Sequence, residues 1–319
     1  MTGPVSAGAR PWRIVFFGSA LFSLPSLEAL LEGPDQVALV VSAPPRPAGR
    51  GRRLTHVPAT RYARENGLEL LESDKPNAPE IRDYIASLEP DLLVVAAYGA
   101  MLGKSLLETG RIPPVNVHPS LLPRHRGPAP VNWALINGDR ETGVSVMLLE
   151  AGMDTGAVLA QTRRPVLPYE GAGELAEKLA RDGADLLALT IKKIKDGSQP
   201  PPRPQDPLLA TTNRLLEKKD GYVDFSRPAS ECAGRINGCD PWPGARARLG
   251  DGEVLFFSAA HGPGSFPPGK VEGLSPEGAL AVGCGEGLLY LKELQAAGKR
   301  RMPAYEFFQG RRPEAFASL

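Results

Sequence analysis

Cysteine is scarce in this chain and lacks the arrangements in which it usually acts. The three cysteines are Cys232, Cys239 and Cys284, and no C-x-x-C pair is present. An odd number without close pairs argues against a disulfide framework or a zinc site and fits a reducing compartment. We therefore expect a cytoplasmic protein with no bound metal.

Long hydrophobic runs are missing as well. No apolar segment approaches the ~20 residues that a membrane-spanning helix needs, so we expect no membrane partner. Residues 1–11 are rich in Gly, Ala and Pro, which predicts a floppy tail and not a signal peptide. A hydrophobic content of 42% is typical of a globular protein with a sizeable core. We expect such a chain to be a monomer.

Several catalytic signatures are absent. The glycine that ends the first expected strand, Gly18, is followed by Ser-Ala-Leu-Phe, so there is no G-x-G-x-x-G fingerprint for a dinucleotide. No phosphate-binding loop is present, and no Ser or Cys stands in a recognisable nucleophile elbow. These absences argue against a Rossmann dehydrogenase, a P-loop NTPase and a hydrolase that forms a covalent acyl intermediate.

The first two thirds of the chain alternate between apolar runs and amphipathic segments. Unbroken apolar strands separated by helices predict a doubly wound, Rossmann-like parallel sheet with both faces covered. The expected strands are residues 13–17, 37–41, 68–71, 91–97 and 115–118, and the expected helices are residues 23–31, 58–66, 79–88 and 174–195.

A proline-rich segment marks the best domain boundary. Ser198–Pro207 holds five prolines in ten residues, a composition typical of a semi-rigid linker. Beyond it, short strands at 245–249, 253–260, 270–274, 279–284 and 288–294, with a helix at 229–237, predict a small OB-like β-barrel. The expected domains are 1–207, carrying catalysis, and 208–319.

Three polar residues form the candidate catalytic set. Asn116 and His118 close an expected strand on the same face, at the edge where sites lie in open α/β sheets. Asp154 stands in the run Gly152-Met-Asp-Thr-Gly156. Alone, each could be structural: a hydrogen-bonded histidine, a turn-capping amide and an ordinary N-cap. Together, without a covalent nucleophile, they suit direct transfer of a small acyl group, with an amide for the oxyanion and an imidazole for the proton.

Basic residues cluster although the net charge is only +1. No acid interrupts residues 46–64, which contain Arg46, Arg50, Arg52, Arg53, Arg61 and Arg64. A second cluster contains Lys299, Arg300 and Arg301. Either could be a solvated surface, but arginines among Gly and Pro also suit phosphate contacts. The segment Asp240-Pro-Trp-Pro-Gly244 we interpret as a tight connector around a packed tryptophan.

These motifs together resemble the methionyl-tRNA formyltransferase family over nearly the whole chain. The resemblance is carried by Phe17-Gly18 with Phe22, the loop Arg46–Leu54, Ala97-Tyr98-Gly99, Asn116-Val-His118, Ser120–Pro123 with Arg126-Gly127, Gly152–Gly156, Asp240–Gly244 and Leu294–Lys299. Three residues depart from the family's pattern: Pro45, Pro119 and His125. None of these belongs to the proposed triad.

The resemblance implies transfer of a formyl group from 10-formyltetrahydrofolate to the amino group of methionyl initiator tRNA. It implies catalysis by Asn116, His118 and Asp154, a folate site at Tyr98, Gly99, Ser120, Leu121, Leu122 and Pro123, and tRNA contacts through Arg46, Arg50, Arg52, Arg53, Lys299, Arg300 and Arg301. Three alternatives stay open. They are a formyltransferase for a small amine, a formyltetrahydrofolate hydrolase, and an RNA-binding protein with a degenerate enzyme fold.

Overall fold

The computed structural model describes residues 10–48, 53–250 and 252–318, and the chain forms two compact units. The first unit contains Met1–Gly127, Gly143–Arg163 and Glu177–Thr212. The second contains Pro128–Thr142, Arg164–Ala176 and Asn213–Leu319. The expected division at residues 207 and 208 stays a prediction. Most of the expected tail at residues 1–11 lies outside the described residues.

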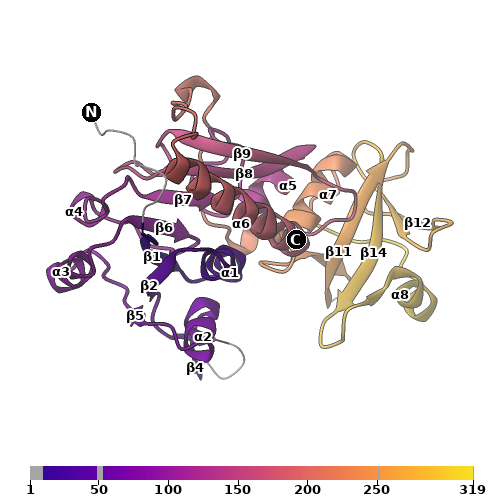
Figure 1. Cartoon of the computed structure of the whole chain (residues 1–319). Coiled ribbons are helices and arrows are strands. Elements are labelled where there is room, and N and C mark those ends of the chain that lie inside the picture. The colour runs from indigo at the N-terminus through magenta and orange to yellow at the C-terminus, as the bar shows by residue number, and fades with distance from the viewer. Residues whose placement is uncertain (1–9, 49–52, 251, 319) are drawn as a thin grey trace. The chain divides into compact units, whose positions relative to one another are not determined.

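A seven-stranded sheet organises the first unit (Figure 1), in the order β5-β2-β1-β6-β7-β8-β9. The strands are β1 (Arg13–Gly18), β2 (Gln36–Ser42), β5 (Leu70–Glu72), β6 (Leu92–Ala96), β7 (Val115–His118), β8 (Glu141–Leu148) and β9 (Val158–Pro165). The pairs from β5 to β7 are parallel, whereas β7 and β8 are antiparallel. The Rossmann-like fold is confirmed, but the expectation of a wholly parallel sheet was wrong.

The error arose because β8 and β9 lack unbroken apolar runs. Gly143 and Ser145 interrupt β8, although six of its eight residues are buried. The strand β9 turns polar halfway, at Gln-Thr-Arg-Arg. By contrast, every residue of β6 is buried, as expected of a central strand covered on both faces.

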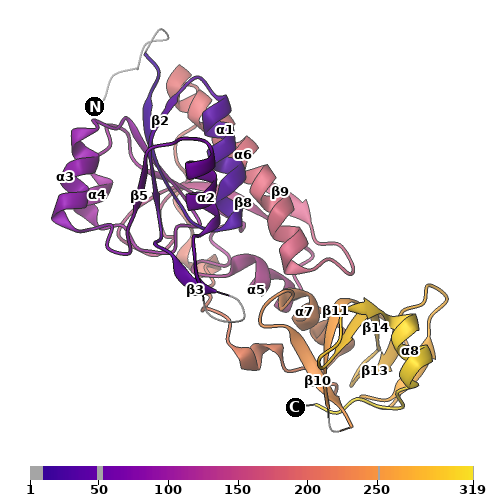
Figure 2. The ribbon, with the colours of Figure 1, turned by 90° about the horizontal axis from the view of Figure 1, so that it is seen from below.

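Helices cover both faces of this sheet. Figure 2 shows α3 (Pro79–Ser87) and α4 (Lys104–Leu107) on one side and α1 (Leu24–Glu32), α2 (Pro58–Glu65) and α6 (Ala172–Asp196) on the other. The buried side chains of Val15, Phe17 and Leu93 pack with Ile85 of α3 and Leu106 of α4. These alternate strand residues form one of the two cores that a doubly wound sheet requires.

The second unit is built on an antiparallel sheet, which confirms the predicted fold class. Its strand order is β10-β11-β14-β13-β12, with β15 paired to β14. The elements are α7 (Ala229–Gly238), β10 (Ala245–Leu249), β11 (Gly252–Gly262), β12 (Val271–Leu274), β13 (Leu280–Gly283), β14 (Leu288–Ala296), β15 (Met302–Pro303) and α8 (Ala304–Arg311). Phe256, Phe225 and Phe316 form an aromatic cluster in its core.

A short segment after α8 joins the two ends of this sheet. Ala317 pairs with Arg248 of β10, and Ala315 pairs with Lys270, which directly precedes β12. The amide of Val271 also donates to the carbonyl of Glu314 over 2.9 Å. Residues 314–317 thus bridge both edges and close the sheet into the barrel that the strand spacing predicts.

Other short elements were not predicted. They include the hairpin of β3 (Arg46–Ala48) and β4 (Arg53–Thr55), the single turn α4, α5 (Pro130–Ile136) of the second unit, and β15 and α8. Across the described residues, no helix combines the length and the apolar character needed to cross a membrane.

Candidate active site

Asn116 and His118 lie at the carboxyl end of β7, inside the first unit. The intervening Val117 is buried in the core, so the alternation of the strand brings the two polar side chains to its other face. Asn116 is 8% exposed and His118 is 5% exposed. This depth favours strong electrostatic interactions with a reacting group.

The ring of His118 contacts one group at each nitrogen. Its Nε2 lies 2.9 Å from the carbonyl oxygen of His125, and its Nδ1 lies 3.7 Å from Oδ2 of Asp154. A carbonyl oxygen can only accept a hydrogen bond, so Nε2 carries the proton there. In the neutral ring, Nδ1 is then the nitrogen that can take up a proton, and it lies on the side of the Asp154 carboxylate. The carboxylate would stabilise the positive charge that results.

Asp154 is held in a backbone conformation that few residues other than glycine adopt. Its φ is +53°, in the left-handed region, where Asp is tolerated better than most side chains. Its Oδ2 accepts a hydrogen bond of 2.8 Å from the amide of Gly127. A Cβ atom on Gly156 would collide with the carbonyl oxygen of Leu148, so only glycine fits beside this turn.

Ser145 of β8 holds the expected folate loop, Ser120–Pro123, through two hydrogen bonds. The Ser145 hydroxyl donates to the carbonyl of Ser120 over 2.6 Å and accepts from the amide of Leu122 over 3.1 Å. The side-chain amide of Gln161, on β9, donates to the carbonyl of Leu122 over 2.9 Å. The peptide bond between Leu122 and Pro123 is cis. The loop is therefore shaped by two strands that the sequence pattern did not reveal.

Tyr98 differs from what its expected role would suggest. Its side chain packs edge-to-face on Phe17, with ring centroids 5.4 Å apart, and its hydroxyl donates to the carbonyl of Ser73. Burial, with a smaller contribution from the charge of Asp74, raises the pKa of Tyr98 to about 12. The ring belongs to the core, the space beside Cα of Gly99 is open, and a folate contact at Tyr98 or Gly99 stays a prediction.

The proline-rich segment contributes to the site as well. Gln205 contacts the turn that carries Asp154 and the side chain of Arg126. The Thr211 hydroxyl accepts from the amide of His125 over 2.8 Å, next to the carbonyl that faces His118. Sequence reasoning treated residues 198–207 as a linker and missed Gln205. It also missed Thr211, which follows that segment. The one available signal was a glutamine within a run of prolines.

Comparisons with known proteins decide the family. Residues 12–191 match the family model described as formyl transferase, and residues 215–312 match its C-terminal domain. The chain is 39% identical over 311 residues to a methionyl-tRNA formyltransferase of Trichlorobacter lovleyi, which covers 97% of this chain and 96% of that protein. It is 41% identical over 303 residues to one of Myxococcus xanthus, with coverage of 95% and 96%. The chain belongs to the methionyl-tRNA formyltransferase family.

A solved structure shares the fold. The crystal structure of HypX from Aquifex aeolicus in complex with tetrahydrofolic acid is similar with a TM-score of 0.59 at 18% identity. The match covers 94% of this chain and 47% of that one, so the similar region makes up about half of HypX.

The basic residues expected to meet tRNA differ in their surroundings. Arg46 and Arg53 are exposed on the hairpin β3–β4, and Lys299 and Arg300 are exposed between β14 and β15. Arg50 and Arg52 lie outside the described residues. The exposed side chains keep the solvent access that a phosphate contact requires.

Arg301, by contrast, is tied to its own unit. Its guanidinium pairs with Glu293 and with Asp240, the latter at 3.3 Å, and lies 4.1 Å from the ring centroid of Phe257. Burial raises the pKa of Asp240, and the charge of Arg301 opposes that rise. These contacts show a structural role for Arg301, whereas its contact with tRNA stays a prediction.

The connector Asp240–Gly244 is as tight as expected but its tryptophan is not packed. Peptide bonds 240–241 and 242–243 are both cis. Trp242 is 55% exposed, so the interpretation of a packed ring was wrong.

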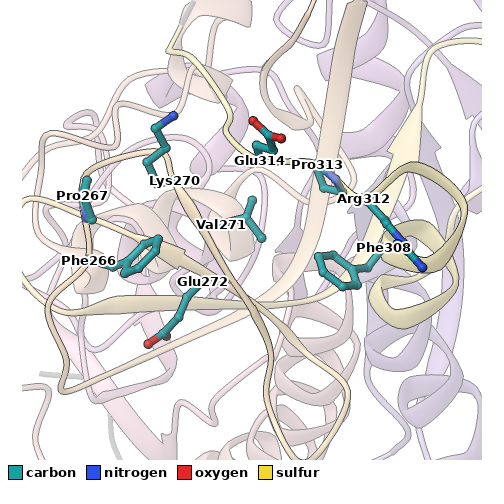
Figure 3. Close-up of a pocket in the computed structure, with 9 residues that line it drawn as sticks. All are labelled: Phe266, Pro267, Lys270, Val271, Glu272, Phe308, Arg312, Pro313 and Glu314. Carbon is teal, nitrogen blue, oxygen red and sulfur yellow. The ribbon is translucent and has the colours of Figure 1, made fainter.

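A pocket of about 580 Å³ lies in the second unit (Figure 3), and its lining residues lie between 266 and 314 in the sequence. Phe266 and Phe308 line it, together with the charged residues Lys270, Glu272, Arg312 and Glu314. It contains none of the expected site residues. Among the described residues, no group of three or more His, Cys, Asp or Glu side chains could hold a metal ion.

Proposed function

We propose that this formyltransferase moves the formyl group of 10-formyltetrahydrofolate to the amino group of methionine on initiator tRNA. Its family membership over nearly the full length carries the proposal. A folate-type formyl donor fits the formyl transferase domain at residues 12–191. The reaction class agrees with a buried amide and imidazole beside a half-buried carboxylate, with no covalent nucleophile among them.

The proposed mechanism is direct transfer. The neutral amine of methionine attacks the formyl carbon, negative charge builds on the formyl oxygen, and the bond from that carbon to N10 of the folate then breaks. The amide of Asn116 donates to the developing oxyanion. The attacking nitrogen loses a proton and N10 gains one, so the net proton count is unchanged.

His118 and Asp154 handle the proton in this scheme. Because the carbonyl of His125 occupies Nε2, the proton from the amine passes to Nδ1, directly or through one water. The charge of Asp154, 3.7 Å away, stabilises the imidazolium until N10 takes the proton up. Asp154 therefore acts by its charge, because this distance exceeds that of a hydrogen bond.

We further propose two contact surfaces and a cellular setting. The folate lies against the loop 120–123, and tRNA phosphates meet the arginines of residues 46–53 and the basic turn with Lys299 and Arg300. The second domain, residues 208–319, serves this tRNA contact. Three free, buried cysteines support a reducing cytoplasm, and we propose a monomer.

One assay separates these proposals from their rivals. The purified protein is mixed with 10-formyltetrahydrofolate and one acceptor: methionylated initiator tRNA, free methionine, glycinamide ribonucleotide or water. We expect rapid formylation of the charged tRNA alone. Efficient transfer to the ribonucleotide would indicate a small-amine formyltransferase. Release of formate in water at the same rate with or without tRNA would indicate a hydrolase.

A further inference from the structure

Gln205 is the exception in an exposed stretch of chain. Of residues 201–209, every one is exposed except Gln205, which is partly buried. Prolines at 204 and 207 restrict the backbone on both sides of it. A long polar side chain loses rotamer freedom when it is ordered, so its burial here indicates contacts that compensate for that loss.

The three polar contacts of Gln205 use both hydrogens of its amide nitrogen and one lone pair of its oxygen. Nε2 donates one hydrogen to the carbonyl of Asp154 over 2.8 Å and the other to that of Gly156 over 2.7 Å. Oε1 accepts from Nε of Arg126 over 2.9 Å. Both donors and the oxygen of the amide are thereby directed at residues in or next to the site.

These contacts act on Asp154 from two directions. The two hydrogen bonds from Nε2 hold the backbone carbonyls of Asp154 and Gly156, which supports the left-handed conformation of Asp154. The contact with Arg126 fixes the segment whose next residue, Gly127, donates to Oδ2 of Asp154. That same Oδ2 is the atom 3.7 Å from Nδ1 of His118.

We propose that Gln205 is a positioning residue for formyl transfer, which sets the place of the Asp154 carboxylate relative to the ring of His118. The proposal rests on the proposed function, in which Asp154 supplies charge to His118. A shift of about 1 Å in a catalytic group can lower a rate roughly a hundredfold, so a side chain that touches no reactant can govern kcat in this way.

The same segment offers a matched control. Gln199 lies in the same proline-rich run, and its amide donates to the carbonyl of Leu159 over 2.9 Å. Its Oε1 is buried and has no hydrogen-bond partner. Gln199 thus anchors the segment without contacting the turn at Asp154. A variant there reports what general loosening of the segment does to activity.

The test compares Gln205→Ala, Gln205→Glu and Gln199→Ala by steady-state formylation of methionyl-tRNA at pH 8 and by thermal unfolding. Glutamate keeps the acceptor for Arg126 but, once ionised, cannot donate to the two carbonyls. We expect kcat to fall roughly ten- to hundredfold in both Gln205 variants, with KM for the folate within about twofold, and to stay near wild type in Gln199→Ala. If Gln205→Ala does not fold, Gln205→Glu decides.

A double-mutant cycle ties the effect to Asp154. Because Gln205 acts through that carboxylate, adding Gln205→Ala to Asp154→Asn should lower kcat by less than about threefold further. A full additional loss in the double variant, or normal kcat in Gln205→Glu, would overturn the proposal. So would an equal loss in Gln199→Ala. Normal kcat in Asp154→Asn alone would instead refute the proposed catalytic role of Asp154, a separate failure.

Discussion

Replacing Asp154 by asparagine removes one charge and little else. The side-chain oxygen of the introduced asparagine could still accept the hydrogen bond from Gly127, and the volume of the side chain is nearly the same. In the native protein the Asp154 side chain is 16% exposed and that of His118 is 6% exposed, with 3.7 Å between Oδ2 and Nδ1. Two unit charges about 4 Å apart interact by roughly 4 kcal/mol at the effective dielectric constant of ~20 that suits such sites.

In the proposed mechanism, His118 gains its positive charge as it takes the proton from the amine, so the charge of Asp154 stabilises that step. Its loss therefore raises the barrier and not the ground state. Since about 1.4 kcal/mol corresponds to a factor of ten, the full interaction is worth about a thousandfold in rate. In the variant, the dipole of the asparagine amide and water near the site should recover part of this stabilisation. We expect kcat of Asp154→Asn to fall roughly a hundred- to a thousandfold, with folate affinity within about twofold.

The assay is single-turnover formylation of methionyl-tRNA at saturating folate, beside direct titration of folate binding. Asp83→Asn on α3 is the matched control, because it also removes one carboxylate but from a side chain that is 66% exposed. The control should retain wild-type kcat. If the Asp154 variant lost folate affinity while its kcat survived, Asp154 would be a binding residue and the charge argument would fail.

Three further predictions concern the other candidate site residues and the basic residues. His118→Ala and Asn116→Ala should each lower kcat roughly a hundred- to a thousandfold without loss of folding, and near-normal turnover in either, checked beside circular dichroism, would remove the mechanism. Arg50→Ala should raise KM for tRNA but not for folate, and should flatten the log–log salt dependence of kcat/KM by about one unit or less; equal slopes would mean a solvated loop. Arg301→Ala should lower the unfolding free energy by about 1 kcal/mol, a small loss because its ion pairs are partly exposed. Arg300→Ala should change only the use of tRNA. Equal melting temperatures for the two variants would contradict the structural role of Arg301.

The sequence predicted the features that depend on neighbouring residues in the chain, such as the burial of a strand and the face on which its side chains lie. The five apolar residues of β6 identify a central strand because only a strand covered on both faces buries such a run. The alternation in β7 places Asn116 and His118 on one face for a similar reason, since side chains of a strand repeat every two residues. The short strands of the second unit were predicted from short apolar runs separated by turn residues.

Features that depend on distant partners could not be predicted this way. Ser145 and Gln205 look like ordinary polar residues until the fold brings them to the loop at Leu122 and the turn at Asp154. The ion pairs of Arg301 with Glu293 and Asp240 join segments up to 61 residues apart, so a charge count alone assigned this arginine to a free basic surface. Sequence reasoning saw the polar character of these residues but not their partners.

The closure of the barrel by residues 314–317 bears on how the protein is made. The ribosome synthesises β10 and β12 well before this segment, so for a time both strand edges have unpaired amides and carbonyls. Exposed strand edges pair readily with other chains. A chain that ends before residue 314 lacks the segment that pairs with both edges, so we expect it to associate with other chains more readily than the full chain does.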